Sequence, residues 1–267
     1  MNTSFERKRR WRRILRMRRS NAHGHTSQVY PIAILCGGLG TRLMPLTTNI
    51  PKALVPVLGR PFIDHHLALL AKRGLERVVL CVGHLGDMIE AHVGDGRRFG
   101  LVVRYSYDGA KQLGTAGAIR RALSLLGDTF FMTFGDSYLD CDYSAVQAEF
   151  ERSGAEALMT VFRNCGDIAR SNVRMCGDDI GAYDKTTSDP SFQHIDYGLS
   201  VYRARTFAAL PEDEPIDLTT VNRRLLSTRS LRAYEVGERF YEVGSSAGIV
   251  DIEMYLSGRA AAPPPRH

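Results

Sequence analysis

The sequence predicts an α/β domain built on a doubly wound, mostly parallel sheet. Two observations lead to this expectation. Short, continuous apolar runs, typical of strands buried on both faces, alternate with helical segments between residues 31 and 162. A glycine-rich loop directly follows the first of these runs, which is where open α/β sheets bind ligands. Strands that alternate with crossover helices favour a parallel, Rossmann-like sheet.

Apolar runs and helical spacing place the elements in this first part of the chain. The first run reads PIAILC, so both faces of that strand are expected to be buried. The first helix carries leucines at helical spacing. We expect strands over 31–36, 78–82, 101–107, 130–134 and 157–162, and helices over 62–73, 87–92, 115–126 and 143–152.

The pattern changes after about residue 165. Strand-like pieces follow one another without long helices between them, which indicates a smaller antiparallel or mixed lobe laid beside the main sheet. One longer helix has Asp217 as its expected N-cap. The strands are expected over 172–176, 180–185, 194–202, 231–235 and 240–243. One helix is expected over 218–227, and a last helix follows the strand 240–243 and ends at about residue 256.

Basic charge is concentrated at the start of the chain. The formal charge of the 267 residues is +6, but residues 1–20 hold nine Arg or Lys and one acid, and the remainder holds 26 basic and 28 acidic residues. Overall charge is therefore no evidence that the folded part binds nucleic acid. We expect a disordered basic extension over 1–29, a domain over 30–258 and a frayed tail over 259–267. For the extension, a true start at Met17, a membrane or nucleic-acid contact and a partner-docking helix stay open.

The cysteines and the hydropathy pattern indicate the compartment. The five cysteines are odd in number and include no C-x-x-C pair, so we expect free thiols in a reducing, cytoplasmic protein and no zinc site. No segment reaches the ~20 uncharged apolar residues of a transmembrane helix. No apolar core of a secretory signal follows the N-terminal charges.

The loop after the first strand is the segment most informative about function. Gly37, Gly38 and Gly40 let backbone N–H groups approach and cradle phosphate oxygens. Arg42 and Lys52 add positive charge suited to a triphosphate, the arginine as a bidentate fork and the lysine as a point charge. The pattern predicts a site for a phosphorylated ligand at this end of the sheet.

Two other phosphate-binding motifs fit this loop less well. A dinucleotide-binding fingerprint needs a third glycine where Leu43 stands, and the acidic residue expected about 20 residues later is missing. The P-loop needs Gly-Lys-Ser/Thr, which the loop does not contain. The remaining alternative is a glycine-rich turn that binds no ligand. The glycines are followed along the chain by Thr41-Arg42 and then by Pro51-Lys52, and this order makes a turn without a ligand a poor explanation.

The full loop resembles the signature of sugar-1-phosphate nucleotidyltransferases. Residues 37–47 read GGLGTRLMPLT and residues 51–57 read PKALVPV. The family patterns are G-G-x-G-[ST]-R-L-x-P-L-T and P-K-x-L-x-P-V, and the resemblance extends over about 31–256. It implies the nucleotide-diphospho-sugar transferase fold and the reaction NTP + sugar 1-phosphate → NDP-sugar + pyrophosphate, with Mg²⁺ as cofactor.

The resemblance also implies roles for single residues. Arg42 would hold the β- and γ-phosphates, and Lys52 would hold the α-phosphate and the sugar phosphate. Together with Asp136 they form the expected catalytic set. The expected nucleotide-binding residues are Leu35, Gly37, Gly38, Gly40, Thr41, Arg42, Gln112, Gly114 and Thr115.

Residues 111–117, KQLGTAG, stand just before an expected helix. A helix N-terminus favours anions, and Gly114 allows close approach to a flat base, although an ordinary helix cap explains the same pattern. The segment is most similar to the base-binding L-G-T-A-G of mannose-1-phosphate and heptose-1-phosphate guanylyltransferases. The resemblance therefore implies GTP with a manno-configured hexose or heptose 1-phosphate, with UDP-, dTDP-, CDP- or ADP-sugar formation as the alternative.

Two carboxylates are the expected magnesium ligands. Asp136 ends a buried strand, where it can face a triphosphate. Residues 241–245, YEVGS, resemble the family's second metal element, D-x-G-[ST], with Glu242 where Asp is usual. For both residues, a structural cap or strand-edge carboxylate is the alternative.

Two further segments resemble the sugar-phosphate side of the family's site. Asp184-Lys185 is similar to an E-K-P element, whose acid contacts sugar hydroxyls and whose lysine contacts the sugar phosphate. Asp196, Tyr197 and Gly198 match an I-N-A-G segment, with Asp in place of Asn and Tyr in place of Ala. Tyr197 either fills part of the sugar pocket or points into the core. These departures leave the sugar undecided.

The expected partners are a nucleoside triphosphate and a sugar 1-phosphate, with no nucleic acid for the folded domain; a homo-oligomer stays open. A non-catalytic nucleotide-sugar-binding regulatory protein is an alternative of a different class. Loss of Arg42, Lys52 or Asp136 would have favoured it, and all three are present. Transfer to a non-sugar phosphate such as phosphocholine is a third alternative.

Overall fold

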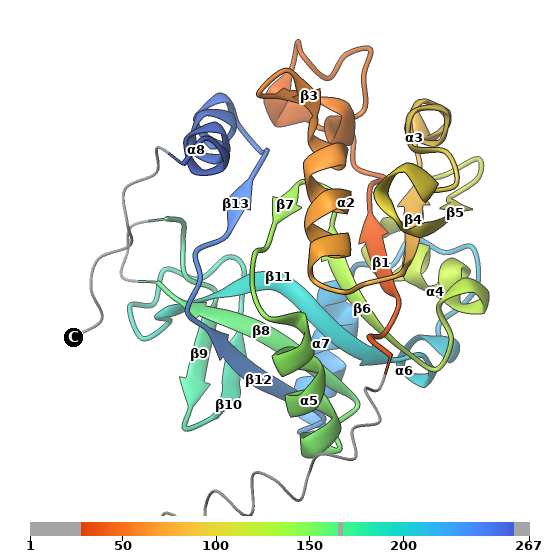
Figure 1. The fold of residues 1–267 in the computed structure, drawn as a ribbon. Coiled ribbons are helices and arrows are strands. Elements are labelled where there is room, and N and C mark those ends of the chain that lie inside the picture. Colours follow the sequence, from red (N-terminus) through yellow and green to blue (C-terminus); the bar gives the residue numbers. More distant parts are fainter. Residues whose placement is uncertain (1–27, 165–167, 259–267) are drawn as a thin grey trace, which may run out of the picture.

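The computed structural model describes residues 28–164 and 168–258, which form one nine-stranded sheet with helices on both faces (Figure 1). The strand order is β5-β4-β1-β6-β11-β8-β12-β10-β9. Almost all of the expected basic extension, the expected C-terminal tail and Cys165 lie outside the described residues. The other four cysteines are free thiols, as expected.

Half of the sheet is parallel, as the alternation of strands and helices predicts. β1 (Ile32–Leu35) lies between β4 (Arg77–Val82) and β6 (Thr129–Phe134), and β5 (Val102–Tyr107) pairs with β4. All four strands run in the same direction, so their carboxyl ends meet at one edge. The glycine-rich loop leaves the sheet at this edge.

Helices cover both faces of the sheet because successive strand residues point to opposite sides. Ile32 and Ile34 pack with residues of α2, α3 and α5, whereas Ala33 packs with residues of α4, α6 and α7. The two helical layers confirm a doubly wound domain (Figure 1). The helices are α2 (Phe62–Lys72), α3 (Gly86–Val93), α4 (Gly114–Leu126), α5 (Tyr143–Ser153), α6 (Arg205–Ala208) and α7 (Leu218–Ser227).

The second part of the chain differs from expectation in one respect, because it extends the main sheet instead of lying beside it. β11 (His194–Arg203) inserts antiparallel between β6 and β8 (Ala157–Arg163). Beyond β8 the sheet continues as β12, β10 and β9. β11 is buried on both faces along most of its length, which requires neighbouring elements on both sides and suits a position inside the sheet. The outer strands are β12 (Leu231–Val236), β10 (Asp179–Tyr183) and β9 (Val173–Cys176).

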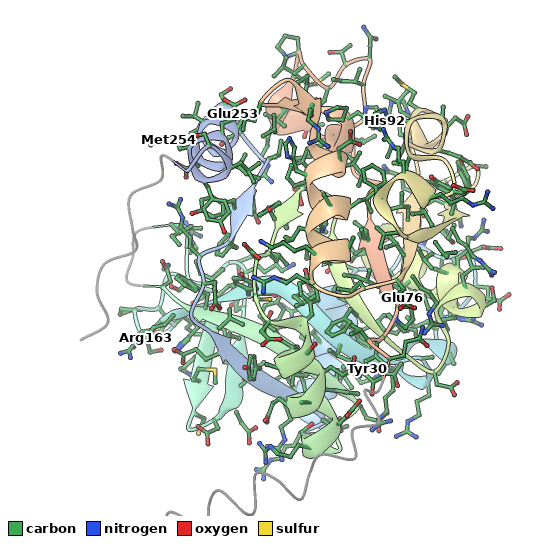
Figure 2. The ribbon with its side chains drawn as sticks, in the orientation of Figure 1. Tyr30, Glu76, His92, Arg163, Glu253 and Met254 are labelled. Atoms are coloured by element: carbon green, nitrogen blue, oxygen red, sulfur yellow. The ribbon has the colours of Figure 1, made fainter. Side chains whose placement is uncertain are left out.

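A third, smaller core joins the glycine-rich loop to the C-terminal helix α8 (Ser246–Leu256). Leu43 and Val55 from the loop pack there with Val243 and Ile252. Glu253 on α8 accepts a hydrogen bond from the Leu58 N–H (2.9 Å; Figure 2). Sequence analysis missed three short strands of this region: β2 (Pro56–Val57) and β3 (Arg60–Pro61), which form a hairpin, and β7 (Ser137–Tyr138). β7 pairs with β13 (Tyr241–Glu242), which lies within the expected strand 240–243.

Within the described ranges, no helix combines the length and the apolar character that crossing a membrane requires.

Candidate active site

A cavity of about 540 Å³ opens at the carboxyl edge of the parallel strands. Every residue expected to bind nucleotide lines it, and so do the three catalytic candidates Arg42, Lys52 and Asp136. These residues come from four segments between positions 35 and 136. The fold therefore brings the whole predicted set to one place, while the role of each member stays a prediction.

The glycine-rich loop is fixed by contacts that only glycine permits. Gly40 has a φ of 65°, and a Cβ there would lie 3.1 Å from Cγ2 of Thr47. The Thr47 hydroxyl donates to the Gly40 carbonyl (2.8 Å), which closes the loop on itself. A short 3₁₀ turn, Thr41–Leu43, follows, with Leu43 buried and Arg42 exposed. The buried leucine anchors the turn and leaves the guanidinium free to face the cavity.

Lys52 and Asp136 meet inside the cavity as an ion pair. Lys52 begins a 3₁₀ turn after Pro51, and Asp136 follows β6. Gly135, directly before Asp136, packs tightly against the end of β1, because a Cβ at that position would lie 2.5 Å from Sγ of Cys36. The pair is largely shielded from solvent, with side-chain exposures of 15% for the lysine and 23% for the aspartate.

Glu242 reaches the same region through the small β7–β13 ladder. It lies opposite Ser137, and the N–H of Val243 donates to the Asp136 carbonyl (2.8 Å). Desolvation by the surrounding protein and the nearby Asp136 carboxylate raise the pKa of Glu242. Gly244 lies beside Arg42, since a Cβ there would be in ordinary contact with a guanidinium nitrogen (3.5 Å).

These two carboxylates are hard oxygen donors on adjacent backbone segments, which suits a magnesium ion that also binds substrate phosphates. Among the described residues, no group of three or more His, Cys, Asp or Glu side chains has the arrangement of an all-protein metal site. A pair of carboxylates completed by phosphate oxygens is therefore the fitting arrangement for a metal here.

The opposite end of the cavity is built around the start of α4. Gln112 donates from Nε2 to the Gly37 carbonyl (3.0 Å) and so joins this segment to the glycine-rich loop. Gly114 has a φ of 66°, and a Cβ there would lie 2.7 Å from the carbonyl oxygen of Ile216. The close approach brings Pro215 to the cavity wall.

Sequence analysis missed Asp108, which lines this end of the cavity and is 7% exposed. Desolvation by burial raises its pKa, although the Leu113 N–H and Arg121 act in the opposite direction. Its position directly after the expected strand 101–107, on the edge that holds the glycine-rich loop, is the signal that could have found it.

The expected sugar-phosphate residues do not line this cavity but gather on the mixed side of the sheet. Tyr183 donates a hydrogen bond to Oδ2 of Asp196 (3.0 Å), and the Lys185 ammonium lies over the Tyr183 ring. A register shift in β11 between Asp196 and Ser200 includes Gly198, whose φ is 94°. Asp196 is also close enough to Glu242 to raise its pKa.

Two of these residues differ from expectation in detail. The Tyr197 ring is buried in the core against Phe240, and its hydroxyl has no hydrogen-bond partner in the described part of the chain. Of the two alternatives open for Tyr197, the structure therefore has the ring in the core and not in a sugar pocket, so Tyr197 leaves the set of expected sugar-phosphate residues. Asp184 accepts hydrogen bonds from the N–H and hydroxyl of Thr186 (2.8 and 2.7 Å), so its carboxylate already stabilises a turn.

Comparisons with known proteins agree with this geometry. Residues 32–167 match the family model described as nucleotidyl transferase. A mannose-1-phosphate guanylyltransferase of Mycobacterium tuberculosis is 30% identical over 187 residues, or 69% of this chain and 52% of the relative. A UTP–glucose-1-phosphate uridylyltransferase of Synechocystis is 28% identical over 201 residues, with the same two shares. The chain spans about half the length of these curated relatives.

A third relative is the D-glycero-alpha-D-manno-heptose 1-phosphate guanylyltransferase of Campylobacter jejuni, 34% identical over 114 residues, which cover 43% of this chain and 51% of the relative. Among solved structures, HddC from Yersinia pseudotuberculosis, complexed with GMP-PN, has a TM-score of 0.70 at 21% identity, covering 85% of this chain and 99% of that one. This likeness shows the fold. On the match over residues 32–167, the chain belongs to the nucleotidyl transferase family.

Proposed function

We propose that the protein transfers a nucleotidyl group from a nucleoside triphosphate to a sugar 1-phosphate and releases pyrophosphate. One observation supports this most: the glycine-rich loop, Arg42, Lys52 and Asp136 share a single cavity at the carboxyl edge of the sheet. Backbone N–H groups and two cations suit a triphosphate, and a carboxylate among them suits a metal ion rather than a phosphate.

The reaction would be an in-line attack of a sugar phosphate oxygen on the α-phosphorus. The nucleophile is already an anion at neutral pH, so no side chain has to remove a proton. The barrier arises from bringing two anions together, and catalysis therefore consists of positioning and charge stabilisation. Arg42 would neutralise the leaving pyrophosphate, while Lys52 would hold the α-phosphate and the incoming phosphate.

Asp136 and Glu242 would hold a Mg²⁺ ion. When bound, this ion would supply a template and a Lewis acid for phosphoryl oxygens. Lys185, whose charge acts on Asp196, would contribute charge to the sugar phosphate. Divalent metal use follows from the family, and the choice of Mg²⁺ rests on the all-oxygen donor pair.

For the substrates, we propose GTP with a manno-configured hexose or heptose 1-phosphate. The relatives named guanylyltransferases support this choice, and those named uridylyltransferases make UTP the alternative. The expected sugar-phosphate segments differ from the family pattern at Asp184 and Asp196, so the sugar needs a direct test.

The test is pyrophosphate release in the presence of Mg²⁺ across five nucleoside triphosphates and a panel of sugar 1-phosphates that includes mannose and manno-heptose. Release with GTP and a manno-configured sugar is the expected result. Release with another pair keeps the reaction and corrects the substrates. If no pair releases pyrophosphate but calorimetry still detects binding of a nucleotide sugar, the result would favour the non-catalytic regulatory protein.

A further inference from the structure

Asp108 is a buried carboxylate in the candidate nucleotide cavity that the proposed chemistry does not use. It directly follows β5, and its own N–H continues the β4–β5 ladder by donating to the Val82 carbonyl (2.9 Å). A carboxylate beside a triphosphate would repel it, so the position of Asp108 along the cavity decides what it can contact.

The sheet places Asp108 well away from Lys52 and Asp136. Asp136 follows β6, and the order β5-β4-β1-β6 puts two strands between the two aspartates. Because neighbouring strands lie about 4.8 Å apart, the ends of β5 and β6 are roughly 14 Å apart. With Lys52 paired to Asp136 at one end, Asp108 lies at the other, where the base of a bound nucleotide would lie.

One oxygen of Asp108 is held in place by the protein. Oδ2 accepts from the Leu113 N–H (3.4 Å), and it packs so closely that a Cβ on Gly37 or Gly83 would lie 3.3 or 3.2 Å from it. Oδ1 has no hydrogen-bond partner within the described residues. The carboxylate is therefore oriented, and it has one acceptor left to offer to a ligand.

The neighbouring side chain adds a second acceptor. Gln112 uses its amide nitrogen on the Gly37 carbonyl (3.0 Å), which leaves its amide oxygen for a ligand. An ionised carboxylate and a carboxamide oxygen can only accept hydrogen bonds. This end of the cavity therefore matches a base that presents adjacent donors.

Guanine is the base with that pattern, because its N1–H and its 2-amino group are donors side by side. Uracil and thymine present one N–H between two carbonyl oxygens, which would face the carboxylate with like charge. Adenine and cytosine place a ring acceptor beside their amino group. We propose that Asp108 selects GTP: its free Oδ1 accepts a hydrogen bond from the 2-amino group of guanine, while the amide oxygen of Gln112 accepts one from N1–H. This inference rests on the proposed nucleotidyl transfer.

The test compares GTP with inosine triphosphate, which lacks only the 2-amino group, and with xanthosine triphosphate, which carries a carbonyl in its place. We expect wild-type kcat/KM to favour GTP over inosine triphosphate by about tenfold or more, the effect of one hydrogen bond to a charged group. Asp108→Asn should bring that ratio close to one. With its oxygen still accepting from Leu113, the new amide would donate to xanthine, so the variant should gain preference for xanthosine triphosphate over GTP.

Misfolding cannot raise kcat/KM for xanthosine triphosphate relative to GTP. The matched control is Asp95→Asn, which changes an exposed carboxylate paired with Arg97. The inference is overturned if the ratio of kcat/KM for GTP to that for inosine triphosphate is the same in Asp108→Asn as in wild type, or if the wild type prefers UTP to GTP. Either result leaves the proposed nucleotidyl transfer intact. If no substrate pair gives turnover, the proposed function fails. Calorimetric Kd values for GTP and inosine triphosphate then decide the role of Asp108, and equal values or no binding overturn it.

Discussion

Lys52 and Asp136, 84 residues apart in the chain, form an ion pair inside the candidate nucleotide cavity. The pair joins the glycine-rich loop to the end of β6. It also links two roles, because the carboxylate expected to hold a metal ion is the partner of the ammonium expected to hold phosphate. Cation binding at Asp136 would leave the Lys52 ammonium available for a phosphate oxygen. We therefore expect loss of either side chain to affect the reaction more than the fold.

Lys52→Ala should lower kcat by ~10²-fold or more, the usual effect of removing one preorganised charge from a transition state. Asp136→Ala should have an effect of similar size. Pyrophosphate release measures the rate, and circular dichroism checks the fold. Lys72→Ala, which removes an exposed lysine from the end of α2, is the control and should keep wild-type turnover. Near-normal turnover of folded Lys52→Ala would remove this residue from the catalytic set.

Glu242→Gln should raise the Mg²⁺ concentration for half-maximal activity by ~10-fold or more, in the range found when groups that support a metal are changed. The amide keeps the size of the side chain but removes its charge. Glu242→Asp, which restores the residue usual in the family, should recover much of the loss. Glu238→Gln alters an exposed carboxylate four residues away and serves as the control. Identical Mg²⁺ titrations for wild type and Glu242→Gln would show that this carboxylate is no ligand.

Lys185→Met should raise KM for the sugar 1-phosphate by ~10-fold and leave KM for the nucleotide unchanged, as expected for loss of one charge-assisted hydrogen bond. The long apolar side chain can still cover the Tyr183 ring, where the lysine lies now. Steady-state kinetics with each substrate varied in turn separates the two constants. A rise in both constants, or in neither, would place Lys185 outside the sugar-phosphate site.

The order and extent of the main elements, and most of the cavity wall, could be predicted because both depend on local sequence. Apolar runs identify β1, β4 and β6, and the loop that follows β1 carries its glycines and cations within a few positions of one another. Asp136 and Gln112 adjoin elements of this kind. The cavity then follows from one rule, that the carboxyl ends of parallel strands share an edge.

What could not be predicted depends on contacts between distant segments. The insertion of β11 between β6 and β8 is a matter of register across the sheet, which apolar pattern alone does not determine. The core position of Tyr197 follows from that insertion and from Phe240, 43 residues further along the chain. Asp108 escaped notice because an aspartate after a strand is common in turns, and only Gly37 and Gly83 reveal how closely it is held.

Gly114→Ala should destabilise the protein more than Gly154→Ala, although the two glycines have nearly the same positive φ, 66° and 64°. Each substitution costs about 1–2 kcal/mol for the left-handed backbone. At Gly154 nothing lies within 4 Å of an added Cβ, whereas at Gly114 the Ile216 carbonyl oxygen would be 2.7 Å away. The overlap should add about 1–3 kcal/mol. Urea unfolding measures the difference, and equal values would mean that the Ile216 segment can shift without cost.

Replacing His66 should remove a specific acid sensitivity of the fold. His66 is fully buried on α2, and neither ring nitrogen has a hydrogen-bond partner among the described residues. Burial lowers its pKa from 6.5 to about 4, partly offset by Asp136. Below about pH 6.5 the unfolded chain therefore binds a proton that the folded chain does not, so the free energy of unfolding falls as the pH drops towards 4.

The full effect of this shift is about 3 kcal/mol. His66→Phe keeps a ring against Phe62 and removes the titrating group, so its free energy of unfolding should rise relative to wild type as the pH falls from 6.5 to 4. Denaturant unfolding at half-unit pH steps gives the difference curve, which cancels the titration of all other groups. The exposed His84, changed to Phe, is the matched control. A flat difference curve for His66→Phe would mean that the buried imidazole is protonated in the folded protein as readily as in the unfolded one.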